Sequence, residues 1–406
     1  MKNDVRSTWQ GRFDGTARHI WTMHRYSRCR FFLLSITNTL FCMPTAPDGT
    51  ARLHNFSAGP GTLPEPVLHE IRNELPVYDT VGASIMEISH RSAPYDAVEE
   101  QARAHLRALL NLDDNWHILF LQGGASMQFH QVPLNFLPPD GHADYVITGR
   151  WSVKAQHEAE RIGTVRVAAT SADTHFAHIP DRDTWTLSPD AAYLHITSNN
   201  TVHGTQFPSD PQADVPIVTD ASSEILSRPM NVDPYGLIYA GAQKNIGPAG
   251  VTLVLVHDDF LQQRKPDLPT MLDYGTHAER RFNTPPTFPI YVVEKVCRWV
   301  RNEGGIPEMH ARNQKKETLL YDRIDRTAFY EGMVEPDARS TMNAIFRLHD
   351  DALQPKFLSA AREAGLINLK GHRSVGGLRA SMYNALPVAA VEALVDFMDE
   401  FERTHG

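Results

Sequence analysis

The middle of the chain is marked by short, mostly apolar runs without polar alternation. They lie at residues 117–121, 144–148, 193–197, 215–219, 237–240 and 251–256. Continuous apolar runs are typical of strands that are buried on both faces, as in parallel sheets. Helix-like stretches such as 152–161 separate several of them, and strands that alternate with helices indicate an α/β domain. We expect this domain to span residues 65–300.

Helical periodicity precedes these strands. Residues 65–76 and 94–110 are predicted helices, and in the second the apolar positions recur every three or four residues, with charged side chains between them. The apolar positions are Ala97, Val98, Ala102, Leu106, Leu109 and Leu110. The pattern predicts a helix with one buried face.

The chain changes character after residue 300. The pattern predicts a long charged helix at 308–325, strands at 342–348 and 376–382, and helices at 354–364 and 388–401. These elements indicate a smaller α+β domain, to which we assign residues 301–406 together with residues 43–64. The proline-rich segment 283–289 is expected to be a stiff connector that does not continue a helix.

The overall composition is that of a globular protein. Hydrophobic residues make up 42% and charged residues 21% of the 406 residues. The net charge of −9 argues against a general nucleic-acid-binding protein. Apolar runs fall short of the roughly 18 residues typical of a membrane span. Cys29, Cys42 and Cys297 lack the spacing of a metal site or a disulfide framework, so we expect no metal and a cytoplasmic protein.

Residues 1–42 form a basic extension. They contain seven Lys/Arg residues and two acidic residues, a formal charge of +5. A basic start followed by the short apolar patch 31–34 is weakly similar to a targeting segment. Three interpretations stay open: a non-folding extension from a start codon that was assigned too early, with Met43 as the true start; a targeting segment; or an ordered accessory element.

The first chemical candidate is the glycine-rich stretch 123–126. It lies between a predicted strand and a predicted helix, where unpaired backbone N–H groups and a helix dipole favour a phosphate. The stretch matches neither a P-loop nor a dinucleotide fingerprint. A tight strand-to-helix turn without a ligand explains it equally well.

The second candidate is the pair Asp220 and Lys244. Asp220 ends one apolar run, and Lys244 follows the next run in "YAGAQKNIGPAG" (239–250), among small residues. A lysine and an acid at the ends of neighbouring strands suit pyridoxal phosphate (PLP), which needs an amine for its aldehyde and an acid for its ring nitrogen. Taken singly, Asp220 could be a helix cap and Lys244 a surface lysine in a turn.

Further cations lie in polar, glycine- or serine-containing stretches. They are His90 and Arg91 in "SHRSAPYD" and His372, Arg373 and Arg379 in "GHRSVGGLRAS". Guanidinium groups suit carboxylates and phosphates, although solvated loops have the same composition. Trp151 follows a predicted strand and could stack on a cofactor ring or pack in the core.

Seven motifs together resemble the phosphoserine aminotransferases, PLP-dependent aminotransferases of fold type I and class V. They are "NFSAGPGTLP" (55–64), "MEISHRS" (86–92), "QGGASMQF" (122–129), "DASSEILSRP" (220–229), "YAGAQKNIGPAG" (239–250), "FNTPPTF" (282–288) and "KGHRSVGGLRASMYNA" (370–385). The resemblance extends from residue 55 to the C-terminus. It implies a large PLP-binding domain similar to that of aspartate aminotransferase, a small domain, and a homodimer with shared active sites. Residues 1–42 have no counterpart in the family pattern.

The resemblance also implies roles in cofactor binding. Lys244 would be the Schiff-base lysine, with one PLP per subunit, and Asp220 would pair with the pyridinium nitrogen. Trp151 would stack on the ring, and Thr201 would bond near its hydroxyl group. The cofactor phosphate would be bound by Ala125, Ser126 and Gln243, and by Asn283 and Thr284 of the neighbouring subunit.

For the substrates, the resemblance implies that Arg91 and Arg379 bind carboxylates, assisted at the phosphate or distal carboxylate by His90, His372 and Arg373. Some members of the family have an arginine in place of Ser126, and this chain lacks it. The implied reaction is reversible amino transfer from L-glutamate to 3-phosphooxypyruvate in serine biosynthesis. Formation of 4-phosphohydroxy-L-threonine for pyridoxine biosynthesis is a second implied role. No nucleic acid or membrane partner is expected.

Three alternatives remain. A cysteine desulfurase of the same fold would need a mobile cysteine, whereas Cys297 lies in a helical pattern. An alanine–glyoxylate type aminotransferase fits the spacing, but has less need of the His/Arg groups. A non-catalytic sugar-phosphate- or nucleotide-binding protein could use the glycine-rich stretch without needing Lys244 and Asp220.

Overall fold

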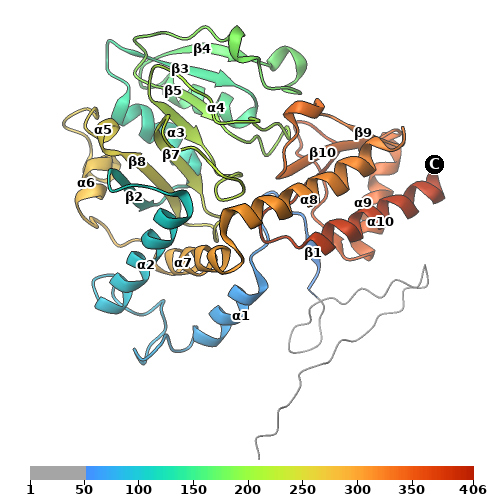
Figure 1. The fold of residues 1–406 in the computed structure, drawn as a ribbon, viewed down its shortest axis with the longest axis horizontal. Coiled ribbons are helices and arrows are strands. Elements are labelled where there is room, and N and C mark those ends of the chain that lie inside the picture. The colour runs from blue at the N-terminus through green and yellow to red at the C-terminus, as the bar shows by residue number, and fades with distance from the viewer. Residues whose placement is uncertain (1–51) are drawn as a thin grey trace, which may run out of the picture. The chain divides into compact units, whose positions relative to one another are not determined.

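The fold was analysed in a computed structural model that describes residues 52–406 (Figure 1). The basic extension predicted for residues 1–42, including Cys29, Cys42 and the possible start at Met43, lies outside the described residues. Residues 54–406 form one compact unit. The predicted boundary between a large and a small domain near residue 300 therefore remains a prediction.

The central element is a seven-stranded sheet with the strand order β2-β8-β7-β6-β5-β3-β4. Its strands are β2 (Trp116–Leu121), β3 (His142–Ile147), β4 (Thr164–Thr170), β5 (Leu194–Thr197), β6 (Ile217–Asp220), β7 (Tyr235–Gly241) and β8 (Thr252–His257). All neighbouring strands pair in parallel except β8, which runs antiparallel to β2 and β7. The predicted α/β fold with a mostly parallel sheet is confirmed.

Helices cover both faces of this sheet, which explains the continuous apolar runs. They are α2 (Ala93–Leu110), α3 (Gly124–Phe136), α4 (Arg150–Ala159) and α7 (Thr287–Asn302). In β2, Ile118 and Phe120 pack in the core that contains α2 and α7, whereas Leu119 and Leu121 pack in the core that contains α3 and α4. Successive side chains of a strand point to opposite faces, so burial on both faces requires apolar residues at successive positions.

The C-terminal part has its own sheet and core. The strands β9 (Tyr330–Gly332), β10 (Asn343–Leu348) and β12 (Leu378–Ser381) form an antiparallel sheet in the order β12-β10-β9. Its helices are α8 (Gly305–Asp325), α9 (Gln354–Glu363) and α10 (Val388–His405), and α8 and α10 lie side by side (Figure 1). Phe56, beside the short parallel pair β1 (His54–Asn55) and β11 (Leu366–Ile367), packs in this core. The α+β character predicted for this part is therefore present.

The remaining helices are short or peripheral: α1 (Glu65–Glu74), α5 (Asp258–Leu261) and α6 (Tyr274–Glu279). The proline-rich segment 283–289 does not continue α6, which fits the predicted connector, but α7 already begins within it, at Thr287. Proline fits the first turn of a helix, where its missing N–H has no intrahelical partner. Within residues 52–406, none of the helices combines the length and the apolar character needed to span a bilayer.

Candidate active site

Lys244 lies in the turn between β7 and β8, beside the carboxyl end of β6. Its Nζ donates a hydrogen bond to Thr201 Oγ1 at 2.7 Å and lies 5.9 Å from the centre of the Trp151 ring. Burial lowers the pKa of Lys244 to about 8, an effect that the positive charge of Arg379 reinforces and the negative charge of Asp220 opposes. A lysine with a lowered pKa is a better nucleophile at neutral pH than an exposed one.

Asp220 is the last residue of β6 and is 5% exposed. Because β6 and β7 are parallel neighbours, their carboxyl ends meet at the same edge of the sheet, where open α/β sheets bind ligands. The Asp220 carboxylate accepts a hydrogen bond from the backbone N–H of Ser222 at 3.0 Å. It is thereby fixed at the edge that also carries Lys244.

The loop after β5 supplies Thr201, which is buried. The loop is anchored by a hydrogen bond from Asn200 Nδ2 to Thr148 Oγ1 at 2.9 Å. Arg379 reaches the same loop from β12 and donates from Nη1 to the Thr201 carbonyl at 3.3 Å. Lys244 and Arg379, which are far apart in sequence, therefore meet at Thr201.

Trp151 is in the first turn of α4, directly after β3. Its ring packs against Phe129 with centroids 6.3 Å apart, and Lys154 Nζ lies 4.5 Å from the ring centre. Buried polar atoms without a hydrogen-bond partner in the described part of the chain include Trp151 Nε1, Asn200 Oδ1 and Arg379 Nε. Buried polar atoms are normally paired, so these atoms fit a site that receives a polar ligand.

The glycine-rich stretch forms the start of α3. Gly123 and Gly124 both have left-handed backbone (φ +92° and +66°), and no side chain caps the helix. Ala125 and Ser126 therefore stand in the first turn with free backbone N–H groups, the arrangement that favours a phosphate. Gln243 is near Lys244, and its backbone carbonyl accepts a hydrogen bond from the Gly61 N–H at 2.7 Å.

A group of cations surrounds His372. Burial is the main cause that lowers the pKa of His372, and the charges of Arg150, Arg379, Arg373 and Lys154 lower it further. Arg150 and Lys154 were not among the residues singled out from the sequence. Arg150 directly precedes Trp151 and Lys154 follows it by three residues, in a stretch where only the tryptophan suggested a function.

Four predicted site residues lie apart from Lys244: His90, Arg91, Asn283 and Thr284. Arg281 Nη1 donates to the His90 carbonyl, and Asn283 Nδ2 donates to Gln122 Oε1 at 2.9 Å. Arg91 and Thr284 are exposed. In the described part of the chain, no hydrogen bond or ion pair joins these four residues to Lys244, Asp220 or Thr201. The structure thus groups most predicted site residues but leaves these four apart.

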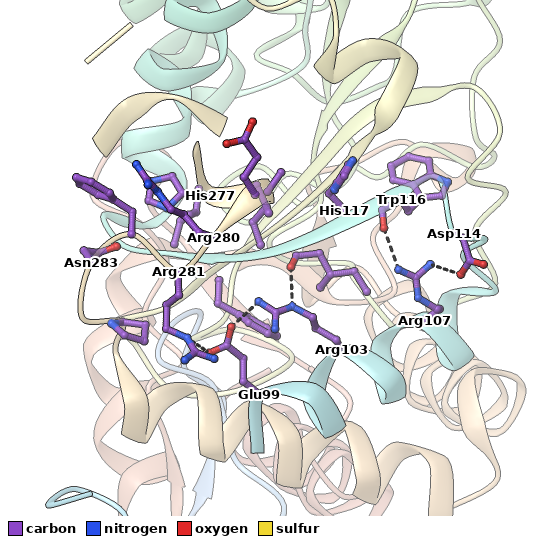
Figure 2. Close-up of a pocket in the computed structure, with 18 residues that line it drawn as sticks. Glu99, Arg103, Arg107, Asp114, Trp116, His117, His277, Arg280, Arg281 and Asn283 are labelled. Atoms are coloured by element: carbon purple, nitrogen blue, oxygen red, sulfur yellow. Dashed lines mark hydrogen bonds and ion pairs between the residues drawn. The ribbon is translucent and has the colours of Figure 1, made fainter. Parts of the chain in front are cut away.

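Asn283 also borders a groove of about 380 Å³ along β2. Figure 2 shows Arg103 and Arg107 reaching from α2 toward this strand. Arg103 Nε donates to the Ile118 carbonyl at 3.1 Å, and Arg107 Nη2 donates to the Trp116 carbonyl at 2.9 Å. These arginines pair with carbonyls on the open edge of the sheet, and neither Lys244 nor Asp220 lines the groove.

The arrangement around Lys244 fits PLP. It combines a partly buried amine of lowered pKa, a fixed carboxylate, an aromatic ring and a helix start with free N–H groups. These groups match the aldehyde, the ring nitrogen, the ring face and the phosphate of that cofactor. Cys297 does not contribute, because it is buried in α7 and burial raises the pKa of its thiol.

Comparison with known proteins agrees with this chemistry. Residues 53–394 match the family model described as Aminotransferase class-V. The chain is 51% identical over 358 residues to the phosphoserine aminotransferase of Pseudomonas aeruginosa and 50% identical over 357 residues to that of Laribacter hongkongensis, covering 87% of this chain and 99% of each relative. The solved phosphoserine aminotransferase of Bacillus circulans subsp. alkalophilus superposes with a TM-score of 0.86 at 47% identity, covering 87% of this chain and 99% of that one. The chain therefore belongs to the phosphoserine aminotransferases, a PLP-dependent family of class V aminotransferases.

Proposed function

We propose that this chain transfers the amino group of L-glutamate to 3-phosphooxypyruvate, giving O-phospho-L-serine and 2-oxoglutarate. The names of its relatives support this reaction. The observation that carries the proposal is the set of cations beside Lys244. The guanidinium groups of Arg373 and Arg379 form no ion pair with a carboxylate of residues 52–406, and such unpaired cations suit a substrate with a phosphate and a carboxylate. The imidazole of His372, whose pKa is lowered, lies among these cations as a further hydrogen-bonding group.

We assign Lys244 as the lysine that holds PLP and Asp220 as the acid that faces its ring nitrogen. When bound, PLP supplies an aldehyde that captures an amino group and a ring that accepts electron density from the substrate Cα. We assign Trp151 to stack on the ring and Thr201 to bond near the ring hydroxyl. The hydrogen bond between Thr201 and Lys244 supports this assignment because it places both groups on one side of the site.

The cofactor phosphate is assigned to the start of α3. The free N–H groups of Ala125 and Ser126, at the positive end of the helix dipole, favour a dianion there. Gln243, next to Lys244, is a further donor. The left-handed glycines at 123 and 124 let the backbone approach the ligand closely.

Lys244 is also assigned the proton transfer at the substrate Cα. A pKa of about 8 leaves roughly a tenth of its amines unprotonated at pH 7, so Nζ is able both to accept and to return a proton near neutral pH. Arg379, which bonds to the Thr201 carbonyl, would orient the substrate carboxylate beside it. His372 and Arg373 would bind the phosphate or distal carboxylate.

We further propose that the active sites are shared in a homodimer. His90, Arg91, Asn283 and Thr284 have no hydrogen bond or ion pair to Lys244, Asp220 or Thr201 within residues 52–406. Arg281 links the two segments that carry them, because its Nη1 donates to the His90 carbonyl and Asn283 follows it by two residues. A second copy would bring Asn283 and Thr284 to the cofactor phosphate and Arg91 to the substrate.

An acceptor-preference assay tests the proposed reaction. The glutamate-loaded enzyme is offered 3-phosphooxypyruvate, pyruvate, glyoxylate and oxaloacetate, and the values of kcat/KM are compared. We expect a clear preference for the phosphorylated acceptor. A preference for glyoxylate or pyruvate would instead support an alanine–glyoxylate type enzyme and would overturn the substrate assignment while leaving the cofactor assignment intact. The same assay, run with the keto acid of 4-phosphohydroxy-L-threonine, tests the second substrate.

A further inference from the structure

Three buried asparagines from three different elements bind one turn that follows Asp220. We call Asn245, Asn313 and Asn384 the asparagine clamp. Their Nδ2 atoms donate to the successive carbonyls of residues 225–227: Asn245 to the first at 2.6 Å, Asn384 to the second at 2.8 Å and Asn313 to the third at 2.9 Å. All three side chains are at most 6% exposed.

The turn that the clamp binds has a strained backbone at its central residue. Leu226 has left-handed backbone (φ +62°), which is unfavourable for a leucine and persists only where the surroundings enforce it. The clamp is also linked internally. Asn313 Nδ2 donates to Asn384 Oδ1 at 2.8 Å, and the Asn384 backbone N–H donates to Asn245 Oδ1 at 2.9 Å. The three asparagines therefore act as one connected network.

Lys316 adds a second connection from the same helix. It lies three residues after Asn313, so both side chains project from one face of α8. Lys316 is fully buried, and its Nζ donates to the carbonyls of Met382 and Tyr383 at 2.8 Å each and to that of Leu386 at 3.3 Å. It forms no ion pair with an acid of residues 52–406. All of its hydrogen bonds go to one turn, residues 382–386.

The 382–386 turn is connected to Lys244 through two of its residues, Tyr383 and Asn384. Tyr383 Oη donates to the Ala58 carbonyl at 2.7 Å, and its ring packs so closely on Gly61 that an added Cβ there would lie 2.7 Å from the ring. Burial raises the pKa of Tyr383 to about 12, and hydrogen bonding to Asn343 and Thr201 acts in the opposite direction. Thr201 is the hydrogen-bond partner of Lys244. The neighbouring Asn384 contacts Asn245, the residue after Lys244.

We propose that Asn313 and Lys316 of α8 are positioning residues for the Lys244 site. They bind the 382–386 turn. This turn places Tyr383 beside Thr201, and its Asn384 bonds to Asn245, the residue after Lys244. Removing either donor leaves buried carbonyls unpaired and allows the turn to shift. The inference rests on the proposed role of Lys244 as the cofactor lysine.

The test compares Lys316→Met with Lys315→Met in the holoenzyme. Methionine keeps the length of the side chain but removes the donors. Lys315 is the exposed neighbour, and its ion-pair partner among residues 52–406 is Glu392 at 3.4 Å. Two quantities are measured. The first is the midpoint pH of the titration of the cofactor absorbance in the absence of substrate, and the second is kcat with saturating substrates. We expect Lys316→Met to move the absorbance midpoint and to lower kcat by about 10- to 100-fold, the cost of a displacement of about 1 Å in an active site. Lys315→Met should leave the midpoint unchanged and kcat within about twofold of the wild type.

Tyr383→Phe is a second form of the test that keeps the buried ring in place. It removes only the hydroxyl through which the turn reaches the site, so we expect it to move the midpoint in the same direction. If Lys316→Met folds, the double variant should shift the midpoint by less than the sum of the single shifts, because both act through one turn. An unchanged midpoint in Tyr383→Phe, or a Lys316→Met protein with a lowered melting temperature but wild-type midpoint and kcat, overturns the proposal. A wild-type protein that shows no PLP absorbance would instead refute the proposed function.

Discussion

Replacing Asp220 or Arg379 should shift the pKa of Lys244 in opposite directions. Burial lowers this pKa to about 8; the Asp220 carboxylate opposes that effect and the Arg379 cation adds to it. Asp220→Asn removes the opposing charge, so the pKa should fall further. Arg379→Met removes a repelling charge, so the pKa should rise toward that of an exposed lysine.

The size of the effect follows from the protonation equilibrium. At pH 7 a pKa of about 8 leaves roughly a tenth of the Lys244 amines unprotonated, about 300 times the fraction in an exposed lysine. A nearby charge shifts a pKa by about one unit or more. One unit would raise the unprotonated fraction to about a half in Asp220→Asn and lower it to about a hundredth in Arg379→Met.

The assay is the rate at which the cofactor-free protein captures PLP between pH 6 and pH 10. The midpoint of the rate profile reports the pKa of Lys244, and ionisation of PLP itself is common to all variants. Arg373→Met is the matched control, because Arg373 belongs to the same cationic group but is not among the charges that shift Lys244. Midpoints that move in the same direction for Asp220→Asn and Arg379→Met, or that do not move at all, would refute the electrostatic reasoning.

The remaining predictions concern the lysine, the shared site and the phosphate-binding helix. Lys244→Ala should abolish turnover while PLP still binds reversibly, and near-normal turnover would contradict the assignment. Mixing Lys244→Ala with Arg91→Ala, each inactive alone, should restore about a quarter of wild-type activity if subunits exchange and sites are shared; no recovery in a proven mixed dimer argues against sharing. Gly123→Ala should weaken PLP binding at least about tenfold in equilibrium dialysis, because the added Cβ would lie 2.5 Å from Met127 Cβ at a residue with φ +92°; Gly82→Ala, where φ is also positive (+77°) but no atom lies within 4 Å of the added Cβ, should not.

Much of the sheet was predictable because its strands are buried on both faces. The edge strand β4 was not, because most of Thr164–Thr170 is exposed and its sequence lacks a continuous apolar run. The antiparallel direction of β8 was equally hidden, since a strand between β2 and β7 is apolar in either direction. Burial determines composition, whereas direction depends on connections that one sequence does not specify.

The site was predictable where residue type and position at a strand end coincided. Asp220 and Lys244 met both conditions. Trp151 was a candidate from its place after a strand, and the family resemblance gave it a role and added Thr201. Arg150 and Lys154 could not be predicted. Their charges act on His372 because α4 packs near a loop that is more than 200 residues away in the sequence.

The α8 network was equally hidden. The sequence presents Lys316 as one charge in a charged helix, although it is fully buried. Asn313 likewise gives no sign in the sequence that it binds a carbonyl 86 residues away. Such long-range partners require the fold.

The central claim is that Lys244 holds the cofactor, and borohydride reduction followed by peptide mass mapping tests it most directly. Reduction fixes PLP on the amine that carries it, and the mapped peptide identifies that amine. Lys154 is the informative rival, because its Nζ lies 4.5 Å from the centre of the same Trp151 ring, closer than the 5.9 Å of Lys244. We predict that the added mass is found on the peptide containing Lys244. Its presence on Lys154 or on any other lysine, with Lys244 unmodified, would contradict the account.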